Sequence, residues 1–334
     1  MNHSGDETWL KIPTYQDILA AQERISPYLK PTPMHTYPAI NELIGAEVYI
    51  KHENSQPVGA FKVRGGVNLI SQLSDQEKER GVIGASTGNH GQSIAYASRI
   101  FGVKATVVVP EKSNPGKIAA IKALGADIVF HGATYDEAKA HCEVLAKDQG
   151  YRYIHSGDEP ELIAGVGTHT LEMLQDEPGI VTIIVPVGGG SGAAGACISA
   201  KSINHEIEVI AVQSEASPAA HDSWKQGVLV ERPNRTSVEG LSTGTAFELP
   251  QRILRKHLDD FILLSEQEIM RSIVWMIQHA HTLAEGAGAA PLAAAYKIRE
   301  RLKGRKVGLI CSGGNLSLDK LRKALDFAMS YPNL

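Results

Sequence analysis

The hydrophobic positions of this 334-residue chain cluster in short runs that do not alternate with polar residues. Each run is rich in valine, isoleucine or leucine, and most end in a glycine-bearing turn that leads into residues with helical periodicity. The runs begin at residues 82, 105, 127, 182, 208, 260 and 307. Strands that are apolar on both faces are typical of a parallel sheet covered by helices on both sides. The pattern therefore predicts an α/β protein.

The order of these runs predicts two domains. Apolar residues at three- and four-residue spacing over 14–29, up to Pro27, predict an N-terminal helix. One compact series of strands and helices lies within 55–154, and a second occupies 180–334. We expect a large domain formed by 1–54 and 155–334, with a small domain, 55–154, inserted into it. This arrangement requires the N-terminal helix to pack on the second series.

Composition limits the classes of partner. Lys and Arg total 33 against 37 Asp and Glu, a net charge of -4, so there is no electrostatic reason to expect nucleic acid or a membrane surface as a partner. No segment reaches the ~20 apolar residues that cross a bilayer, and the first residues do not resemble a secretion signal. The three cysteines are too few and too scattered for a disulfide framework or a zinc site. We expect a cytoplasmic protein.

Three glycine-rich segments follow predicted strands, which is where ligands bind in open parallel sheets. The first, GGGSGAAG at 188–195, precedes a predicted helix, so its N–H groups and the helix dipole favour a phosphate. The same segment spells GxGxxG at 190–195, and Glu215 follows 20 residues later. This spacing also fits a dinucleotide-binding loop, so a nicotinamide-dependent oxidoreductase is an open alternative. The catalytic histidine with a carboxylate partner that such an oxidoreductase usually carries is not recognisable in this sequence.

The second segment, STGNHGQ at 86–92, gathers hydroxyl, amide and imidazole groups at the start of a predicted helix. Such residues also serve as helix N-caps, but seven adjacent polar or glycine residues exceed what one cap needs. We expect it to bind a small carboxylate or another anion. The third segment, CSGGN at 311–315, would be an ordinary turn if taken alone. It gains interest from its expected place at the same edge of the sheet.

Lys62 stands in an unusual setting, ENSQPVGAFKVRGG at 53–66, between Phe61 and Val63 and close to three glycines. Partial burial lowers the pKa of a lysine, and the neutral amine forms Schiff bases with carbonyl groups. The structural alternative is a lysine whose stem is buried and whose ammonium reaches solvent. Together with a phosphate loop and a carboxylate loop, the Schiff-base interpretation is favoured. Pyridoxal 5'-phosphate carries both an aldehyde and a phosphate.

Four motifs, in the same order, resemble those of the fold type II (β-family) pyridoxal-phosphate enzymes, specifically the threonine dehydratase and serine racemase group. ENSQPVGAFKVRGG is similar to N-x-Q-x-T-G-S-F-K-x-R-G, and ASTGNHGQ to S-x-G-N-H-x-Q. VGGGSGAAG is similar to the tetraglycine phosphate loop, and CSGGN to S-G-G-N. The resemblance runs from about residue 14 to 325. It implies two open, twisted, mostly parallel sheets with helices on both faces and the smaller domain inserted in the larger.

The resemblance also implies a role for each matched residue. Lys62 would bind the cofactor aldehyde as a Schiff base and then move the Cα proton of the substrate. The other implied cofactor-binding residues are Phe61 and Glu285 near the ring, Asn89 at the 3'-oxygen, Ser312 at the pyridine nitrogen, and Gly188, Gly189, Gly190, Ser191 and Gly192 in the phosphate loop. The implied substrate-binding residues are Ser86, Thr87, Gly88, Asn89 and His90. Thr87 is also a catalytic candidate, because racemases carry a proton-donating serine at its place.

The implied reaction is an α,β-elimination. A serine at the pyridine nitrogen cannot supply the negative charge that would keep this nitrogen protonated, so a long-lived carbanion is less favoured than loss of a β-substituent. We expect a β-hydroxy amino acid, by default L-threonine or L-serine, to give a 2-oxo acid and ammonia. The alternatives are an amino acid racemase, a dehydratase of phenylserine or hydroxyaspartate, the oxidoreductase, and a non-catalytic small-ligand binding protein. A homodimer or higher homo-oligomer is expected.

The chain also departs from the family pattern. Ala60 replaces the usual serine before Phe-Lys, and Gly286 replaces the usual proline after the glutamate. Some relatives bind a divalent cation through a Glu, a main-chain carbonyl and an Asp. Glu215 and Ala219 match this set, but His221 stands where the Asp is expected and Asp222 is adjacent. The departures leave the substrate open, and a metal stays undecided.

Overall fold

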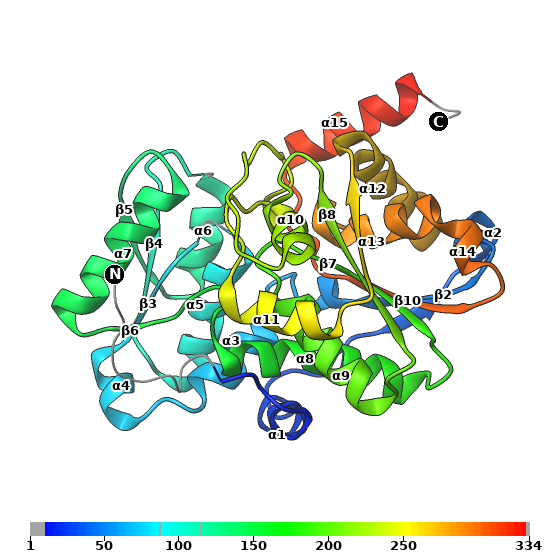
Figure 1. The fold of residues 1–334 in the computed structure, drawn as a ribbon. Coiled ribbons are helices and arrows are strands. Elements are labelled where there is room, and N and C mark those ends of the chain that lie inside the picture. The colour runs from blue at the N-terminus through cyan, green and yellow to red at the C-terminus, as the bar shows by residue number, and fades with distance from the viewer. Residues whose placement is uncertain (1–10, 87, 114, 332–334) are drawn as a thin grey trace. The chain divides into compact units, whose positions relative to one another are not determined.

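In the computed structural model, residues 11–86, 88–113 and 115–331 are described. The chain divides into two compact units, Met1–Lys30 with Lys62–Val166 and Pro31–Phe61 with Gly167–Leu334 (Figure 1). The helix α8, Pro160–Asp176, runs from the first unit into the second. Among the described residues, no helix has both the length and the apolar character to cross a membrane.

The smaller unit is built on a four-stranded sheet in the order β5-β4-β3-β6, and all its strands are parallel. Helix α7 packs on β3, β4 and β6, and α5 packs on β3 and β4. The elements are α1 (Tyr15–Ile25), α3 (Lys62–Ile70), α4 (Asp75–Arg80), β3 (Val82–Ala85), α5 (Asn89–Phe101), β4 (Ala105–Val109), α6 (Pro115–Ala123), β5 (Asp127–Phe130), α7 (Tyr135–Gln149) and β6 (Arg152–Tyr153).

The larger unit is built on a six-stranded sheet in the order β1-β2-β10-β7-β8-β9, in which only β1 is antiparallel to its neighbour. Helix α13 packs on β7, β8, β9 and β10, and α9 packs on β7 and β8. The elements are β1 (Met34–Thr36), α2 (Pro38–Ile44), β2 (Glu47–His52), η2 (Glu53–Ser55), β7 (Thr182–Pro186), α9 (Ser191–Ile203), β8 (Glu208–Ser214), α10 (Ala219–Gln226), η3 (Glu239–Leu241), α11 (Glu248–His257), β9 (Asp260–Leu264), α12 (Glu266–Ala280), α13 (Gly286–Lys297), α14 (Arg299–Leu302), β10 (Lys306–Cys311) and α15 (Leu318–Ser330).

The apolar runs of the sequence form the strands that they predicted. β4, ATVVV, is buried along its whole length, and β8, EVIAVQS, is buried from its second residue on. Because parallel strands are flanked by helices on both faces, such strands lack the alternation of a half-exposed sheet. The α/β class and the two mostly parallel sheets are therefore confirmed.

The N-terminal helix lies in a different unit from the one expected. α1 buries Ile18, Ala21 and Ile25 and packs on α3, and the Arg24 guanidinium donates a hydrogen bond to the Asn68 side chain at 3.4 Å. The compact units thus divide the chain at 30, 61 and 166, whereas the sequence suggested boundaries at 54 and 154. Periodicity shows that one face of a helix is buried, but it does not show which element covers that face.

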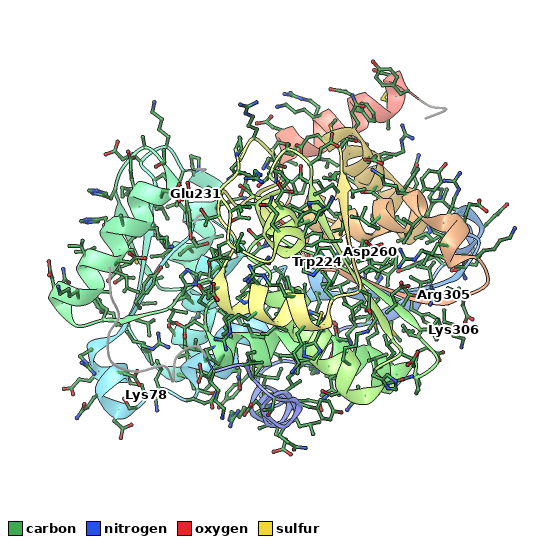
Figure 2. The ribbon with its side chains drawn as sticks, viewed as in Figure 1. Lys78, Trp224, Glu231, Asp260, Arg305 and Lys306 are labelled. Carbon is green, nitrogen blue, oxygen red and sulfur yellow. The ribbon has the colours of Figure 1, made fainter. Side chains whose placement is uncertain are left out.

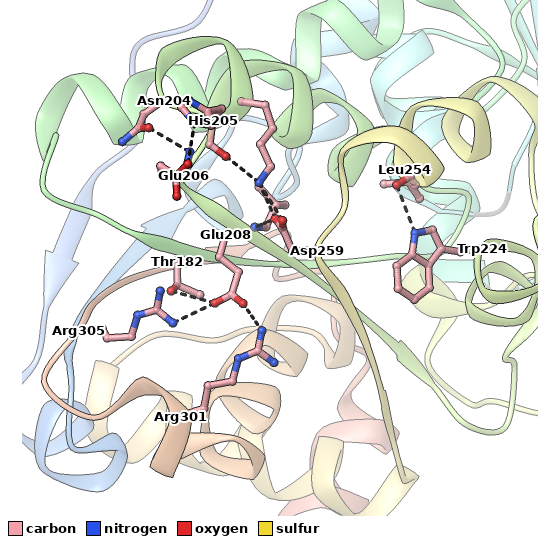
Figure 3. Close-up of polar contacts among 12 residues, drawn as sticks. Thr182, Asn204, His205, Glu206, Glu208, Trp224, Leu254, Asp259, Arg301 and Arg305 are labelled. Carbon is pink, nitrogen blue, oxygen red and sulfur yellow. Dashed lines mark hydrogen bonds and ion pairs between the residues drawn. The ribbon is translucent and has the colours of Figure 1, made fainter.

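Charged side chains gather at the amino ends of the larger sheet, at the starts of β7, β8 and β10. Figure 2 labels Arg305 and Lys306 on this edge. The Glu208 carboxylate pairs with Arg301 and, at 3.0 Å, with Arg305, as Figure 3 shows. Nearby, the ammonium of Lys201 lies 2.7 Å from the Asp259 carboxylate. The glycine-rich segments 188–195 and 311–315 lie at the opposite edge of this sheet, where its strands end.

Candidate active site

The segment before Lys62 pairs with the CSGGN segment that follows β10. Ala60 and Gly313 form an antiparallel bridge, and the N–H of Phe61 donates to the Ser312 carbonyl oxygen at 3.0 Å. The N–H of Gly314 donates to the carbonyl oxygen of Gly59 at 2.9 Å. Below these bonds, the Asn315 side chain donates to the Val58 carbonyl oxygen at 2.8 Å. The third glycine-rich segment thus fixes the backbone that leads to the lysine.

The ring of Phe61 lies against the phosphate-loop candidate. A Cβ on Gly192 would be 2.9 Å from Phe61 Cε2, so only glycine leaves room for the ring here. The other side of Phe61 meets His169 edge to face, with ring centroids 5.9 Å apart. Lys62 follows Phe61 directly, and consecutive Cα atoms are about 3.8 Å apart. The lysine is therefore covalently joined to a residue that both the first and the third glycine-rich segments hold.

The segment 188–191 has the form of an anion site. Gly190 precedes α9 with a φ of 94°, and no side chain caps the helix there. A Cβ on Gly188 would be 2.5 Å from the Gly240 carbonyl oxygen, and one on Gly189 would be 2.2 Å from Phe247. The N-terminal N–H groups of a helix have no partner within the helix, so an uncapped glycine-rich start can accept an anion.

Glu285 joins the same group of loops. Its N–H donates to the Gly313 carbonyl oxygen at 3.0 Å, and it precedes the first residue of α13. A Cβ on Gly313 would be 2.5 Å from Glu285 Oε1, so the carboxylate lies against the CSGGN backbone. Within the larger unit the structure thus brings together Phe61, Glu285, Ser312 and the 188–192 loop.

Lys62 opens α3 in the smaller unit and is partly buried. Its Nζ donates to the Ser156 carbonyl oxygen at 2.8 Å, and its own carbonyl oxygen accepts from Ser93 Oγ at 2.7 Å. Burial lowers the pKa of the Lys62 amine from 10.5 to about 8. This raises the neutral fraction at pH 7 by roughly two orders of magnitude, which suits an amine that must attack a carbonyl group.

Within the STGNHGQ segment, Gly88 caps α5, which begins at Asn89. Ser86 Oγ accepts from the N–H of Gly88 at 3.1 Å, and His90 Nε2 lies 3.2 Å from the Ile154 carbonyl oxygen. Burial and the nearby Lys62 lower the pKa of His90 to about 3, so its ring is neutral and Nε2 carries the proton. Thr87, the catalytic candidate of this segment, lies outside the described residues.

His90 Nδ1 is a buried acceptor with no hydrogen-bond partner in the part of the chain that the structure describes. A buried acceptor without a partner is costly, and it marks a place where a donor would be favourable.

Sequence reasoning missed the segment 155–159, which follows β6. The Glu159 carboxylate accepts two bonds from the Arg152 guanidinium, at 2.8 and 2.7 Å, and one from the N–H of His155 at 3.1 Å. The pair fixes the turn whose Ser156 carbonyl binds Lys62. The other three loops were found because each follows an apolar run that predicts a strand. The 155–159 segment also follows a strand, but β6 has only two residues and gives no recognisable apolar run.

His155 is held as a neutral ring. Its Nδ1 accepts from the N–H groups of Gly157 and Asp158 at 3.2 and 2.8 Å, which leaves the proton on Nε2. Burial, reinforced by the positive charges of Lys139 and Lys62, lowers its pKa to about 3. His155 therefore cannot act as a general acid at neutral pH, but its position beside Ser156 makes it part of the surroundings of the lysine.

The residues suggested by the metal-binding relatives make contacts with other side chains. Asp222 binds His221 Nδ1 at 2.9 Å and the Arg232 guanidinium at 2.5 Å, and these contacts lower its pKa. Glu215 is exposed. Among the described residues, no cluster of three or more metal-ligating side chains is present. The Asp222 carboxylate is thus paired with a guanidinium.

The model of one protein family, "Pyridoxal-phosphate dependent enzyme", matches residues 25–313. The chain belongs to this family. The membership overturns the nicotinamide alternative. The GxGxxG motif at 190–195 could not separate the two cofactors, because an uncapped glycine-rich helix start suits the phosphate of either one.

Curated relatives of this pyridoxal-phosphate enzyme include two ammonia-lyases. The chain is 34% identical over 314 residues to an L-threonine ammonia-lyase of Thermotoga maritima, covering 94% of this chain and 78% of that protein. It is 34% identical over 310 residues to an L-threo-3-hydroxyaspartate ammonia-lyase of Saccharomyces cerevisiae, covering 92% and 95%. Among solved structures, a serine racemase of Dictyostelium discoideum has a TM-score of 0.87 at 36% identity, covering 92% of this chain and 99% of that one.

The residues fit pyridoxal phosphate. The uncapped start of α9 suits the phosphate. A side chain at Gly188 or Gly189 would clash with neighbouring residues, so glycine keeps the backbone of this loop accessible. The amine of Lys62, with its lowered pKa, suits the aldehyde. Both elements were predicted from their residue types in the sequence.

Proposed function

We propose that this pyridoxal-phosphate enzyme dehydrates and deaminates a β-hydroxy amino acid, by default L-threonine or L-serine, to a 2-oxo acid and ammonia. The observation that carries the proposal is the amine of Lys62 with its lowered pKa. Lys62 directly follows Phe61, whose ring contacts the glycine-rich 188–192 loop and whose N–H donates to the Ser312 carbonyl oxygen. The names of the ammonia-lyase relatives support the reaction class.

The cofactor, when bound, draws electron density from the Cα–H bond of the substrate amino acid. We propose that Lys62 Nζ accepts the Cα proton, because a pKa of about 8 lets it both take up and release protons near neutral pH. The uncharged Ser312 does not stabilise a long-lived carbanion, which favours departure of the β-hydroxyl group. The hydroxyl takes up a proton as it leaves, so Cα loses a proton and Cβ loses a hydroxyl with net release of one water molecule. The released aminoacrylate then hydrolyses to the 2-oxo acid and ammonia.

The substrate carboxylate is proposed to bind the 86–90 segment. The N-terminus of α5 offers N–H groups there. Asn89, the first residue of this helix, is proposed to contact the cofactor, and Glu285 to lie near its ring. Racemisation is the second candidate, supported by the solved serine racemase. It needs a proton donor on the opposite face, a role proposed for Thr87.

The decisive experiment combines colour with product. We expect the purified protein to show a visible absorption band that borohydride abolishes, and to form 2-oxo acid from L-threonine or L-serine. Lys62→Ala should lose the borohydride-sensitive band and at least a thousandfold in kcat, as expected for a residue that moves the reacting proton. The matched control is Lys78→Ala, a surface lysine labelled in Figure 2 whose contact with Asp75 is 3.8 Å long. A colourless protein would contradict the proposal.

A substrate panel then identifies the amino acid. L-threonine, L-serine, L-threo-3-hydroxyaspartate and phenylserine are compared by kcat/KM for 2-oxo acid formation, and serine enantiomers are resolved to detect racemisation. A higher rate of racemisation than of 2-oxo acid formation would replace the dehydratase by the racemase.

A cytoplasmic location is proposed on the basis of the three cysteines, which are all free and buried. Cell fractionation tests it.

A further inference from the structure

The side chain of Tyr135, the first residue of α7, lies between two loops of the smaller unit. The residue is 40% exposed, but its hydroxyl group is buried. The hydroxyl donates to the Ala85 carbonyl oxygen at 3.5 Å and forms a hydrogen bond with the Ser156 side chain. Ala85 directly precedes the 86–90 segment, and the Ser156 carbonyl oxygen accepts from the amine of Lys62. One tyrosine thus contacts both loops.

The contact with Ala85 takes the place of a backbone bond in the sheet. β3 and β6 are parallel neighbours, and the Ile83 carbonyl oxygen accepts from the N–H of Ile154 at 2.9 Å. Successive residues of a strand point their carbonyl groups to opposite sides, so the Ala85 carbonyl oxygen faces the same side as that of Ile83. β6 ends at Tyr153, and the Tyr135 hydroxyl donates to Ala85 where a longer β6 would offer an N–H group.

The two loops diverge beyond this point. The N–H of Ser86 donates to the carbonyl oxygen of Val108 on β4 at 3.2 Å, and β4 lies on the other side of β3 from β6. The chain after β6 folds back instead, since the Glu159 carboxylate accepts from the N–H of His155 at 3.1 Å. Neither bond fixes one loop against the other. A side chain that contacts both loops therefore helps to set their separation.

Tyr135 itself is held in place by the start of its helix. Thr134 and Glu137 form a capping box there, and the Glu137 carboxylate also accepts from the N–H of Ala133 at 2.5 Å. α7 packs on β3, β4 and β6, as Figure 1 shows, and buries Ala138. Burial raises the pKa of the Tyr135 hydroxyl, so it stays protonated and can donate one hydrogen bond while it accepts another.

We propose that Tyr135 is a positioning residue that holds the 86–90 segment at a fixed distance from the turn that binds the Lys62 amine. The inference rests on the proposed function, which assigns the substrate carboxylate to the first loop and the Cα proton to Lys62. A substrate held by its carboxylate presents this proton to the amine only when the two loops are correctly spaced, and small errors in such spacing are costly in rate. The ring alone does not supply the spacing, because the hydroxyl makes both contacts.

The first test separates the two contacts in the full chain loaded with cofactor. Ser156→Ala removes one partner of the Tyr135 hydroxyl but keeps the backbone carbonyl that binds Lys62. We expect kcat to fall about fivefold, the factor that corresponds to one neutral hydrogen bond, with KM unchanged. Tyr135→Phe keeps the ring but removes both contacts, so it should lower kcat by the same factor and also raise KM about threefold or more.

The double variant tests whether the two hydroxyl groups act on each other. Tyr135→Phe with Ser156→Ala should have the kcat of Tyr135→Phe alone, because both substitutions break the same bond. If the two losses multiply instead, the hydroxyl groups act separately and the proposal is wrong. The visible absorption band counts the loaded sites in each variant, so that a loss of folded protein is not mistaken for a lower kcat.

The second test needs no turnover. Butyrate, a carboxylate without an amino group, is titrated into the loaded protein by calorimetry. Tyr135→Phe should weaken its binding about threefold or more, and Ser156→Ala should bind it normally. Tyr28→Phe is the matched control, because Tyr28 is 43% exposed in the same unit and packs edge to face on Phe101 at 4.9 Å. It should change neither the kinetics nor the binding.

The outcomes separate this inference from the proposed function. Tyr135→Phe with unchanged kcat, KM and butyrate binding would overturn the positioning role while the dehydratase activity stands. A protein that forms no 2-oxo acid, but whose butyrate binding depends on Tyr135, would contradict the proposed reaction and keep the role of Tyr135 at the carboxylate segment. If butyrate does not bind to the unmodified protein, the carboxylate role of 86–90 is wrong and the inference fails with it.

Discussion

At the residue scale, Lys62 shows how position sets chemistry. It is the first residue of α3, where the helix dipole disfavours a positive charge, and burial disfavours it further. The backbone carbonyl oxygen of Ser156 accepts a hydrogen bond from its amine. A carbonyl group carries no charge, so this contact holds the proton less strongly than a contact with a carboxylate would.

The glycine at 189 gives the first prediction at this scale. A methyl group there would begin 2.2 Å from the Phe247 ring, so Gly189→Ala must displace either the ring or the loop. We expect at least a tenfold loss of cofactor affinity, measured by titrating the protein stripped of its cofactor with pyridoxal phosphate and following absorbance. The control is Gly244→Ala, whose Cβ meets its nearest neighbour at 3.7 Å, and which should bind normally.

The second prediction at this scale concerns His155 and the pH dependence of the free energy of unfolding. Its pKa is about 3 in the folded chain and about 6.5 when unfolded, so the unfolded chain takes up a proton first as the pH falls. The stability contributed by the neutral ring is present above pH 6.5 and is lost progressively down to pH 3. His155→Asn should therefore be destabilised relative to the unmodified protein at pH 7.5, and this difference should shrink by about 3 kcal/mol at pH 4.5.

Urea unfolding at the two pH values measures this difference. The exposed His205, with 83% of its side chain accessible, is the control, and His205→Asn should show no such change. A difference for His155→Asn that does not depend on pH would contradict the assignment.

At the scale of elements, sequence patterns predicted the strands that are buried on both faces of a sheet. They did not predict a strand that is only partly buried. β3, β4, β7 and β8 were recognisable because each is an apolar run. β6 was not, because two partly buried residues give no pattern, and the 155–159 segment was lost with it. The glycine-rich loops were found from their residue types, but the pairing of 58–61 with 312–315 joins residues about 250 positions apart and leaves no local signal.

The 155–159 segment carries the prediction at this scale. Glu159→Ala would leave the Arg152 guanidinium without its two charged bonds and the N–H of His155 without its acceptor. We expect a loss of about 3 kcal/mol in unfolding free energy, because one member of a mostly buried ion pair is removed. The Ser156 carbonyl should lose its fixed position, and kcat should fall with it.

Chemical denaturation and 2-oxo acid assays measure the two effects. Glu79→Ala removes an exposed carboxylate from α4 and should change neither. If Glu159→Ala keeps full activity, the segment does not position the lysine.

At the scale of the whole molecule, the Asp222–Arg232 pair bears on cofactor requirements. Arg232 follows the isolated bridge of Glu231 with Thr245, so its guanidinium ties the 228–245 stretch to α10. We expect EDTA to leave the rate of 2-oxo acid formation unchanged, because the carboxylate is already neutralised. Arg232→Met should lower the rate, and added Mg²⁺ or Ca²⁺ should then bind at the exposed carboxylate and restore part of it. A loss of activity on chelation of the unmodified protein would contradict this.

The pairing of 58–61 with 312–315 limits how the length of this chain can change in evolution. A single inserted or deleted residue between Val58 and Lys62 would shift the register by about 3.3 Å and turn the next side chain to the other side. The reactive amine would then leave its place even though every residue type were kept. We expect homologous chains to vary in length in surface stretches such as 228–236 but to keep a constant count of residues here.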